Sequence, residues 1–161
     1  MKHEFIKDLT NGRLLVNRSF AAPLSAVWRA WTEAELLEQW WAPQPWKAVT
    51  KSMNFTAGGR WHYYMAGPDG EKHWTFMDFL EIRPQTFIKT EDGFCDEAGN
   101  VTASELTSIW EIHFIEEGEQ TLVRIIMQYA NETALKQIVE MGMEEGFTMG
   151  LNQLENLLQH G

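Results

Sequence analysis

The segment Glu132–Gln159 predicts an amphipathic helix, and that helix constrains how the rest of the chain folds. Its apolar residues recur at spacings of three and four, which places them on one helical face: Leu135, Val139, Met143, Phe147, Leu151, Leu154 and Leu158. A helix with one apolar stripe must bury that stripe against a second layer. The residues before Glu132 therefore have to supply an apolar surface that covers it.

The part of the chain before this helix predicts strands that are joined mainly by hairpins. A first strand is expected over 12–20, and two short helices follow it, beginning near Pro23 and Thr32 and ending before Pro43. Further strands are expected over 47–56, 60–66, 71–83, 86–90, 110–114 and 123–127, with a loop over 91–103. This order favours an α+β fold, in which a curved antiparallel sheet of about six or seven strands wraps around the C-terminal helix.

The tight turn Gly67–Gly70 sets the expected register of the central hairpin, because proline at its second position and glycine at its fourth favour a tight turn. If Gly67 opposes Gly70, Tyr63 faces Trp74 and Trp61 faces Phe76. Alternation then gives the hairpin one apolar face, formed by Trp61, Tyr63, Met65, Trp74, Phe76, Leu80 and Ile82. Asp78 is expected on the same face. The other face is polar and carries Arg60, His62, Tyr64, His73 and Thr75.

The number of large apolar side chains is high, with 8 Trp, 9 Phe, 3 Tyr and 8 Met in 161 residues. These residues either fill the core or line an internal cavity for an apolar ligand. A cluster of three tryptophans around Pro43 and Pro45, namely Trp40, Trp41 and Trp46, is either a lid over such a cavity or a structural corner.

The charge of the chain excludes one large class of partners. Asp and Glu total 23 against 13 Lys and Arg, which gives a formal net charge of -10. A surface of this sign repels a phosphate backbone, so no nucleic-acid partner is expected. The apolar stretches are much shorter than the roughly 20 residues of a membrane span, and the single cysteine, Cys95, excludes an internal disulfide. A soluble protein of the cytoplasm, without a membrane partner, is expected.

Several local motifs carry a resemblance to a known family, and they follow one another along nearly the whole chain. They are Arg18–Pro23, Val27-Trp28, Trp31-Thr32, Leu37–Trp41, Phe55–Trp61, Gly67–Gly70, Leu80–Pro84, and Gly146-Phe147 with Leu151, Leu154 and Leu157. Together they resemble the domain related to the activator of the heat-shock-protein-90 ATPase, a member of the START-like (SRPBCC) superfamily with the helix-grip fold. The resemblance implies one such domain over residues 1–161.

The resemblance also implies a hydrophobic ligand cavity between the sheet and the C-terminal helix. The expected register independently directs a set of side chains toward that space: Trp61, Tyr63, Trp74, Phe76, Trp110, Ile112, Met143 and Phe147. Glycines recur at Gly142, Gly146 and Gly150 along one flank of the helix, where they either allow close packing against the sheet or leave room for a ligand. Gly146 and Gly150 are therefore included in the predicted binding site.

Asp78 is the candidate for polar chemistry, since a carboxyl group among apolar neighbours must be hydrogen-bonded, hydrated or shifted in pKa. Facing the cavity, it would orient a ligand or act as a weak candidate general base; at a bulge, it would turn to solvent. His62 and His73 lack a visible third ligand, so no metal site and no cofactor are expected.

Three functions stay open on the sequence alone. The preferred one is binding of a hydrophobic or aromatic small molecule without turnover. The alternatives are a cyclase-, aromatase- or hydrolase-type enzyme that uses the same cavity, and a co-chaperone-like interaction module. A homodimer and a chaperone ATPase partner also stay open.

Overall fold

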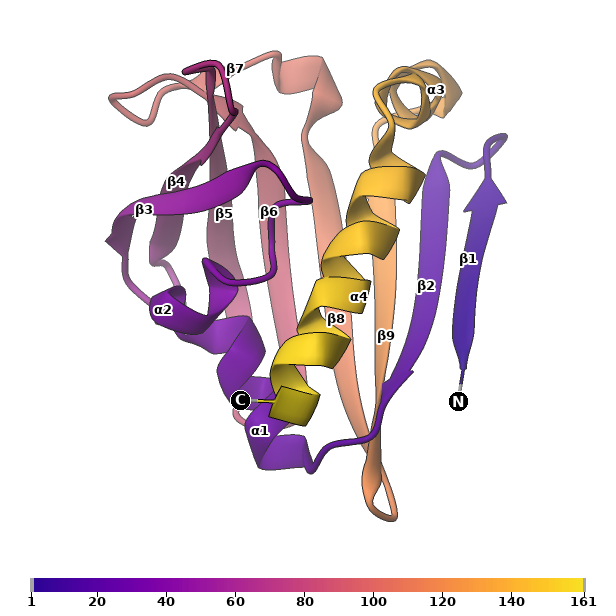
Figure 1. The fold of residues 1–161 in the computed structure, drawn as a ribbon. Helices are drawn as coiled ribbons and strands as arrows, with labels where there is room; N and C mark the ends of the chain where they lie inside the picture. The colour runs from indigo at the N-terminus through magenta and orange to yellow at the C-terminus, as the bar shows by residue number, and fades with distance from the viewer. Residues whose placement is uncertain (1, 161) are drawn as a thin grey trace.

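One antiparallel sheet curves around helix α4 (Figure 1). The computed structural model describes residues 2–160, and nine strands lie within that range. Their order in the sheet is β1-β2-β9-β8-β6-β5-β4-β3, and β7 pairs with β6 away from this path. Helices α1 and α2 lie at the lower left in this view and α4 crosses the concave side of the sheet, as the expected α+β helix-grip fold requires. That expectation is confirmed.

The bounds of the elements follow the chain from a short edge strand to the long terminal helix. They are β1 His3–Asp8, β2 Arg13–Phe20, α1 Leu24–Thr32, α2 Ala34–Leu37, β3 Lys47–Met53, β4 Arg60–Ala66, β5 Lys72–Arg83, β6 Phe87–Cys95, β7 Val101–Thr102, the 3-10 turn Ser104–Leu106, β8 Ser108–Glu117, β9 Gln120–Tyr129, α3 Glu132–Glu140 and α4 Met143–His160.

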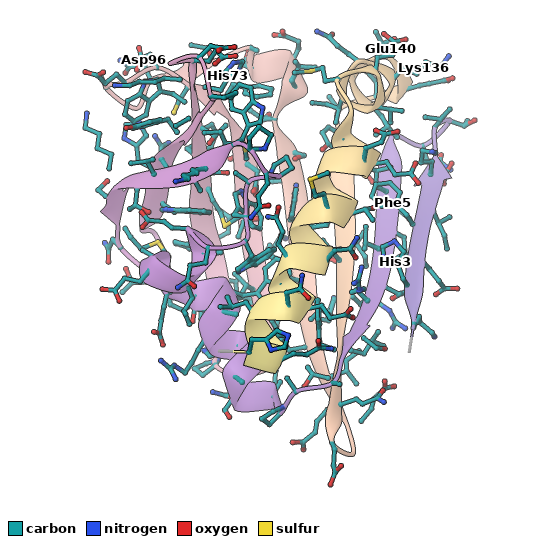
Figure 2. The ribbon with its side chains drawn as sticks, in the orientation of Figure 1. His3, Phe5, His73, Asp96, Lys136 and Glu140 are labelled. Carbon is teal, nitrogen blue, oxygen red and sulfur yellow. The ribbon has the colours of Figure 1, made fainter. Side chains whose placement is uncertain are left out.

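Two of these strands were not expected from the sequence. Strand β1 is a mostly exposed edge strand, so its residues show no alternation of apolar and polar side chains; Figure 2 shows His3 and Phe5 on it. Strand β7 has only two residues. Strand β6 is also longer than the expected 86–90, because it continues through Asp92 and Gly93 to Cys95. The sheet is therefore wider than expected, and the predicted loop begins later.

The expected register of the β4–β5 hairpin is wrong by one residue. Tyr64 pairs with Trp74 and Trp61 pairs with Met77. The reason is the turn, in which the Gly67 amide bonds to the Glu71 carbonyl at 2.9 Å, so the chain reverses one residue later. Because side chains alternate, the shift reverses the faces of β5 relative to β4.

The corrected register gives β5 a different buried face. Thr75, Met77 and Phe79 share the concave face with Trp61 and Tyr63, and Met77 and Phe79 are nearly inaccessible to solvent. By the same alternation, Trp74, Phe76 and Asp78 belong to the convex face. The expected apolar set was thus correct for β4 and inverted for β5 as far as Phe79. Beyond a register shift after Phe79, Leu80 is exposed, whereas Ile82 pairs with Ile88 and packs against the core as expected.

The C-terminal helix is interrupted, whereas one helix over 132–159 was expected. Helix α3 ends at Glu140, and Gly142 adopts a φ of +87°, which favours glycine because it has no Cβ. Helix α4 begins at Met143 and runs in a different direction (Figure 1). Gly142 is therefore a helix-ending residue, and the break places the joint between the two helices over one end of the sheet.

Helix α4 is held against the segment 40–44 by direct contact with the backbone. A Cβ on Gly150 would lie 3.1 Å from the Trp40 carbonyl oxygen and 3.3 Å from that of Trp41. One turn later, the side-chain nitrogen of Gln153 donates to the carbonyls of Trp40 and Ala42 at 2.9 and 2.8 Å. The side-chain oxygen of Gln153 accepts from the backbone amide of Gln44 at 2.9 Å. Gly150 thus serves close packing, one of the two roles considered for it.

This contact predicts opposite effects for two glycine substitutions in α4. Gly150→Val forces side-chain atoms against two backbone carbonyls, so it should lower the free energy of unfolding by about 1–3 kcal/mol. Gly146→Ala adds a Cβ whose nearest neighbour is Pro43 Cγ at 3.6 Å, so its better helix propensity should raise stability by up to about 1 kcal/mol. Urea unfolding followed by tryptophan fluorescence measures both. Equal effects of the two substitutions would contradict the close contact at Gly150.

Candidate functional site

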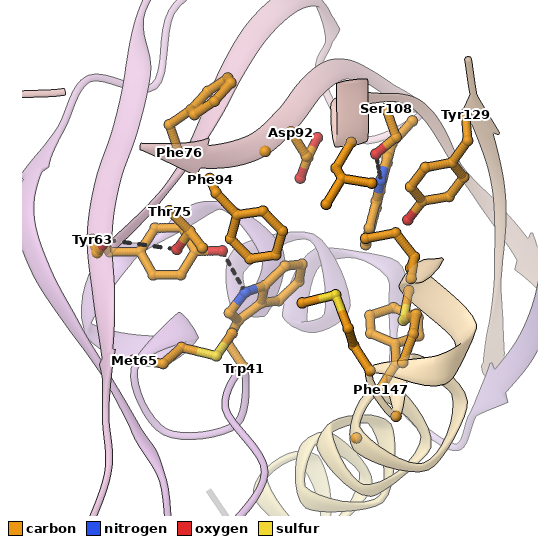
Figure 3. A pocket seen from close by; sticks show the side chains of 18 of the residues that line it. Trp41, Tyr63, Met65, Thr75, Phe76, Asp92, Phe94, Ser108, Tyr129 and Phe147 are labelled. Carbon is orange, nitrogen blue, oxygen red and sulfur yellow. Dashed lines mark hydrogen bonds between the residues drawn. The ribbon is translucent and has the colours of Figure 1, made fainter. Parts of the chain in front are cut away.

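A cavity of about 300 Å³ lies between the concave face of the sheet and the joint of α3 and α4 (Figure 3). Strands β4, β5, β6, β8 and β9 form one wall, and the two helices with the segment 41–43 form the other. The lining residues are mostly aromatic or aliphatic: Trp41, Pro43, Tyr63, Met65, Thr75, Phe76, Asp92, Gly93, Phe94, Leu106, Ser108, Trp110, Tyr129, Ile138, Met141, Gly142, Met143, Gly146 and Phe147.

Part of the predicted site borders this cavity. The predicted residues that line it are Tyr63, Phe76, Trp110, Met143, Gly146 and Phe147. Phe76 reaches it despite belonging to the convex face, because its cross-strand partner is Gly93, which has no side chain to intervene. Gly146 borders the cavity, and its role in leaving room for a ligand stays a prediction.

The other predicted residues lie elsewhere. Trp61 is fully buried behind the cavity wall, where its ring stacks on Tyr63 at 3.7 Å between centroids. Ile112 is a core residue, and Gly150 packs against backbone as described above. Trp74 contacts Tyr64 on the convex face, with 4.7 Å between the ring centroids.

Asp78 is directed away from the cavity, contrary to the expected apolar-face position. It pairs with Arg60 across β4 and β5, and the guanidinium donates to both carboxylate oxygens at 2.5 and 3.1 Å. Arg60 also donates to the Gly99 carbonyl at 2.6 Å and lies over the Phe76 ring. The cause is again the one-residue register shift, which also places His62 and His73 on opposite faces. Asp78 thus joins a structural ion pair that ties the 96–100 turn to the sheet.

Asp92 is the carboxyl group that lines the cavity, and sequence reasoning missed it. The Asp92-Gly93 pair was interpreted as part of a loop, whereas both residues lie inside β6. Asp92 pairs with Met77 on β5 and Ser108 on β8, and Ser108 pairs with Tyr129 on β9. Ile88, Thr90 and Asp92 are two residues apart and all face inward. This continued alternation was the sequence signal that could have indicated that the strand extends to Asp92.

The surroundings of Asp92 disfavour its charged form. Burial raises the pKa of its carboxyl to about 8; a hydrogen bond from the Thr90 hydroxyl opposes the rise, and the carboxylates of Asp78 and Glu91 add to it. Burial also raises the pKa of Tyr129 to about 12. Asp92 is therefore largely protonated at neutral pH, while the Tyr129 phenol keeps its proton.

Trp41 forms the cavity wall opposite the sheet. Its indole nitrogen donates to the Tyr63 hydroxyl at 2.9 Å, and its ring contacts Trp110 and Phe147 at centroid distances of 6.0 and 6.1 Å. The adjacent Trp40 points into the core, where its indole nitrogen donates to the Ala30 carbonyl at 2.9 Å. The tryptophan cluster therefore combines a structural corner at Trp40 with a cavity wall at Trp41.

Comparison with known proteins assigns the family. The model of the family described as Activator of Hsp90 ATPase homolog 1-like protein matches residues 21–159. The chain belongs to this family. No curated protein matches the chain significantly.

Solved structures that are similar to this chain come from several bacteria. A solution NMR structure of a protein from Arthrobacter aurescens has a TM-score of 0.91 and 30% identity, covering 98% of this chain and 92% of that one. A crystal structure of a protein from Mycobacterium smegmatis has a TM-score of 0.89 and 30% identity, covering 98% and 97%. A solution NMR structure of a protein from Staphylococcus epidermidis has a TM-score of 0.84 and 30% identity, covering 96% of this chain and 93% of that one.

Within residues 2–160 of this family member, no helix combines the length and the hydropathy needed to cross a bilayer.

The raised pKa of Asp92 predicts a pH-dependent contribution to stability. Between about pH 4 and about pH 8 the folded protein holds this proton and the unfolded chain releases it, so this contribution to the free energy of unfolding falls as pH rises. Asp92→Asn removes the effect. The stability of the variant relative to the parent should therefore increase across this window and level off above about pH 8.

Chemical unfolding of both proteins at several pH values, followed by tryptophan fluorescence, measures this difference. Comparing parent with variant cancels the titration of all other groups. A difference that stays constant from about pH 5 to about pH 9 would show that Asp92 is ionised in the folded protein throughout.

Proposed function

We propose that the protein binds a small apolar or aromatic molecule, without turnover, in the cavity between the sheet and helix α4. The observation that carries this proposal is the cavity itself, with its wall of aromatic rings at the joint of α3 and α4. Its volume of about 300 Å³ lies at the lower end of small-molecule sites, which suits a ligand of one or two rings.

Binding is preferred over catalysis because two hydroxyl groups of the lining already accept hydrogen bonds and the predicted base lies elsewhere. The Tyr63 hydroxyl accepts a hydrogen bond from Trp41, and the Ser108 hydroxyl accepts one from Trp110 at 2.9 Å. Asp78, the earlier candidate base, is engaged by Arg60 on the other face. These groups support a shaped, apolar container more than a set of reacting side chains.

A titration with prodan, a neutral naphthalene dye whose emission shifts to the blue in apolar surroundings, tests the proposal. Trp41 and Trp110 line the cavity and should transfer excitation to the bound dye, so saturable one-to-one binding with tryptophan-sensitised dye emission is expected. Native mass spectrometry of the purified protein would detect a co-purified ligand.

Gly146→Leu places a side chain at the cavity rim beside Pro43 and should weaken dye binding by about tenfold or more while the fold is retained. Met149→Leu, on an exposed position of the same helix, is the matched control and should bind like the parent. Retained binding in Gly146→Leu would move the ligand away from the helix. If neither prodan nor any other apolar probe binds, the proposal fails, and an interaction with a partner protein, as the family description suggests, becomes the function to test.

A further inference from the structure

The cavity has one polar end, and residues from three neighbouring strands form it. Asp92 on β6, Ser108 on β8 and Tyr129 on β9 occupy the same level of the sheet, because Asp92 pairs with Ser108 and Ser108 pairs with Tyr129. All three line the cavity, and Figure 3 shows them along its upper edge. Alternation directs all three toward helix α4.

Within this row, Asp92 keeps an unused acceptor. One carboxylate oxygen accepts a hydrogen bond from the Thr90 hydroxyl, and no further hydrogen bond to the carboxyl group occurs within residues 2–160. The Ser108 oxygen already accepts from the Trp110 indole. A ligand that reaches this end of the cavity therefore meets an accessible carboxyl oxygen that accepts no hydrogen bond from residues 2–160.

The rest of the lining supplies no positive charge to this carboxyl group. Among the lining residues of the described chain, Asp92 alone has an acidic or basic side chain, and none is lysine, arginine or histidine. Arg60 is committed on the convex face to Asp78 and to the Gly99 carbonyl. The walls instead present aromatic rings: Trp41, Tyr63, Phe76, Phe94, Trp110, Tyr129 and Phe147.

We propose that the cavity selects an apolar molecule that ends in a protonated amine, with the ammonium group against Asp92 and the apolar part among the aromatic rings. The inference rests on the proposed function and names its ligand class. An ammonium group supplies the missing donors and the opposite charge, and aromatic faces attract the same cation. A carboxylate ligand would meet repulsion wherever Asp92 is ionised, and a neutral alcohol would gain the hydrogen bond without the charge attraction.

The proposal couples binding to a proton. Asp92 must ionise to pair with an ammonium group, and burial keeps it largely protonated below about pH 8, so affinity for the amine should rise about tenfold per pH unit up to that point. The charged or titratable groups around Asp92 are Tyr63 on β4, Asp78 on β5, Glu91 on β6 and Tyr129 on β9. Burial raises the pKa of both tyrosines, so neither loses its proton in this range.

Displacement of prodan by four phenylalkyl probes of similar length tests the inference on the full chain. They are 2-phenylethylammonium, propylbenzene, 2-phenylethanol and 3-phenylpropionate. At about pH 8 the ammonium probe should bind about tenfold or more tightly than propylbenzene, and 3-phenylpropionate most weakly. Asp92→Asn should remove the preference for the ammonium probe and leave propylbenzene binding in place. Asp78→Asn, which removes a carboxyl group outside the cavity, should retain the preference.

Each outcome separates this inference from the proposed function. If prodan and propylbenzene bind but the ammonium probe binds no better than propylbenzene or 2-phenylethanol, the inference is overturned and the cavity function stands. A preference that survives Asp92→Asn also overturns it. If no probe binds, the proposed function itself fails. Should Asp92→Asn not fold, the pH profile of the parent decides, because an affinity for the amine that is flat from about pH 6 to about pH 8 contradicts pairing with Asp92.

Discussion

The contact between helix α4 and the segment 40–44 positions the rest of the structure. Gly150 lets the helix reach the carbonyls of Trp40 and Trp41, and the Gln153 carboxamide hydrogen-bonds to the backbone of the same segment. This contact fixes the distance between the helix and the sheet. It also fixes Trp41, whose ring then closes the cavity against Trp110 and Phe147. The space that remains, at the broken joint of α3 and α4, is the candidate site.

Within that space, two opposing effects act on one carboxyl group. Burial among aromatic rings disfavours the charge of Asp92, and only the Thr90 hydroxyl is bonded to the group within the described chain. The sheet nevertheless holds it in place, because β6 lies between β5 and β8 and is paired on both sides at this level. A half-buried acid with a raised pKa weakens the fold at high pH, and residues of this kind are frequent at functional sites.

The sequence was sufficient for the architecture, because hairpin alternation and a helical apolar stripe are strong local signals. It was insufficient wherever pairing with a distant strand overrides a local signal. Asp92-Gly93 has the composition of a turn, yet pairing with β5 and β8 keeps it extended. The Gly67–Gly70 turn closes at Glu71, which shifts the register by one residue. Thr75 and Met77 therefore lie on the concave face, where Asp78 was expected. Three equally spaced glycines looked alike, whereas Gly142 ends a helix and Gly150 contacts backbone.

Helix α4 contacts the backbone of the segment 40–42 rather than its side chains. The acceptors in this contact are peptide carbonyls, which are present whatever side chains occupy the segment 40–42. Side chains around the cavity, such as Met65, Phe94 or Leu106, can therefore change without removing the contacts that Gly150 and Gln153 make with this backbone. Proteins that share 30% of their residues with this chain superimpose on it with TM-scores of 0.84 to 0.91. Such a scaffold permits the lining of the cavity to change without a new fold.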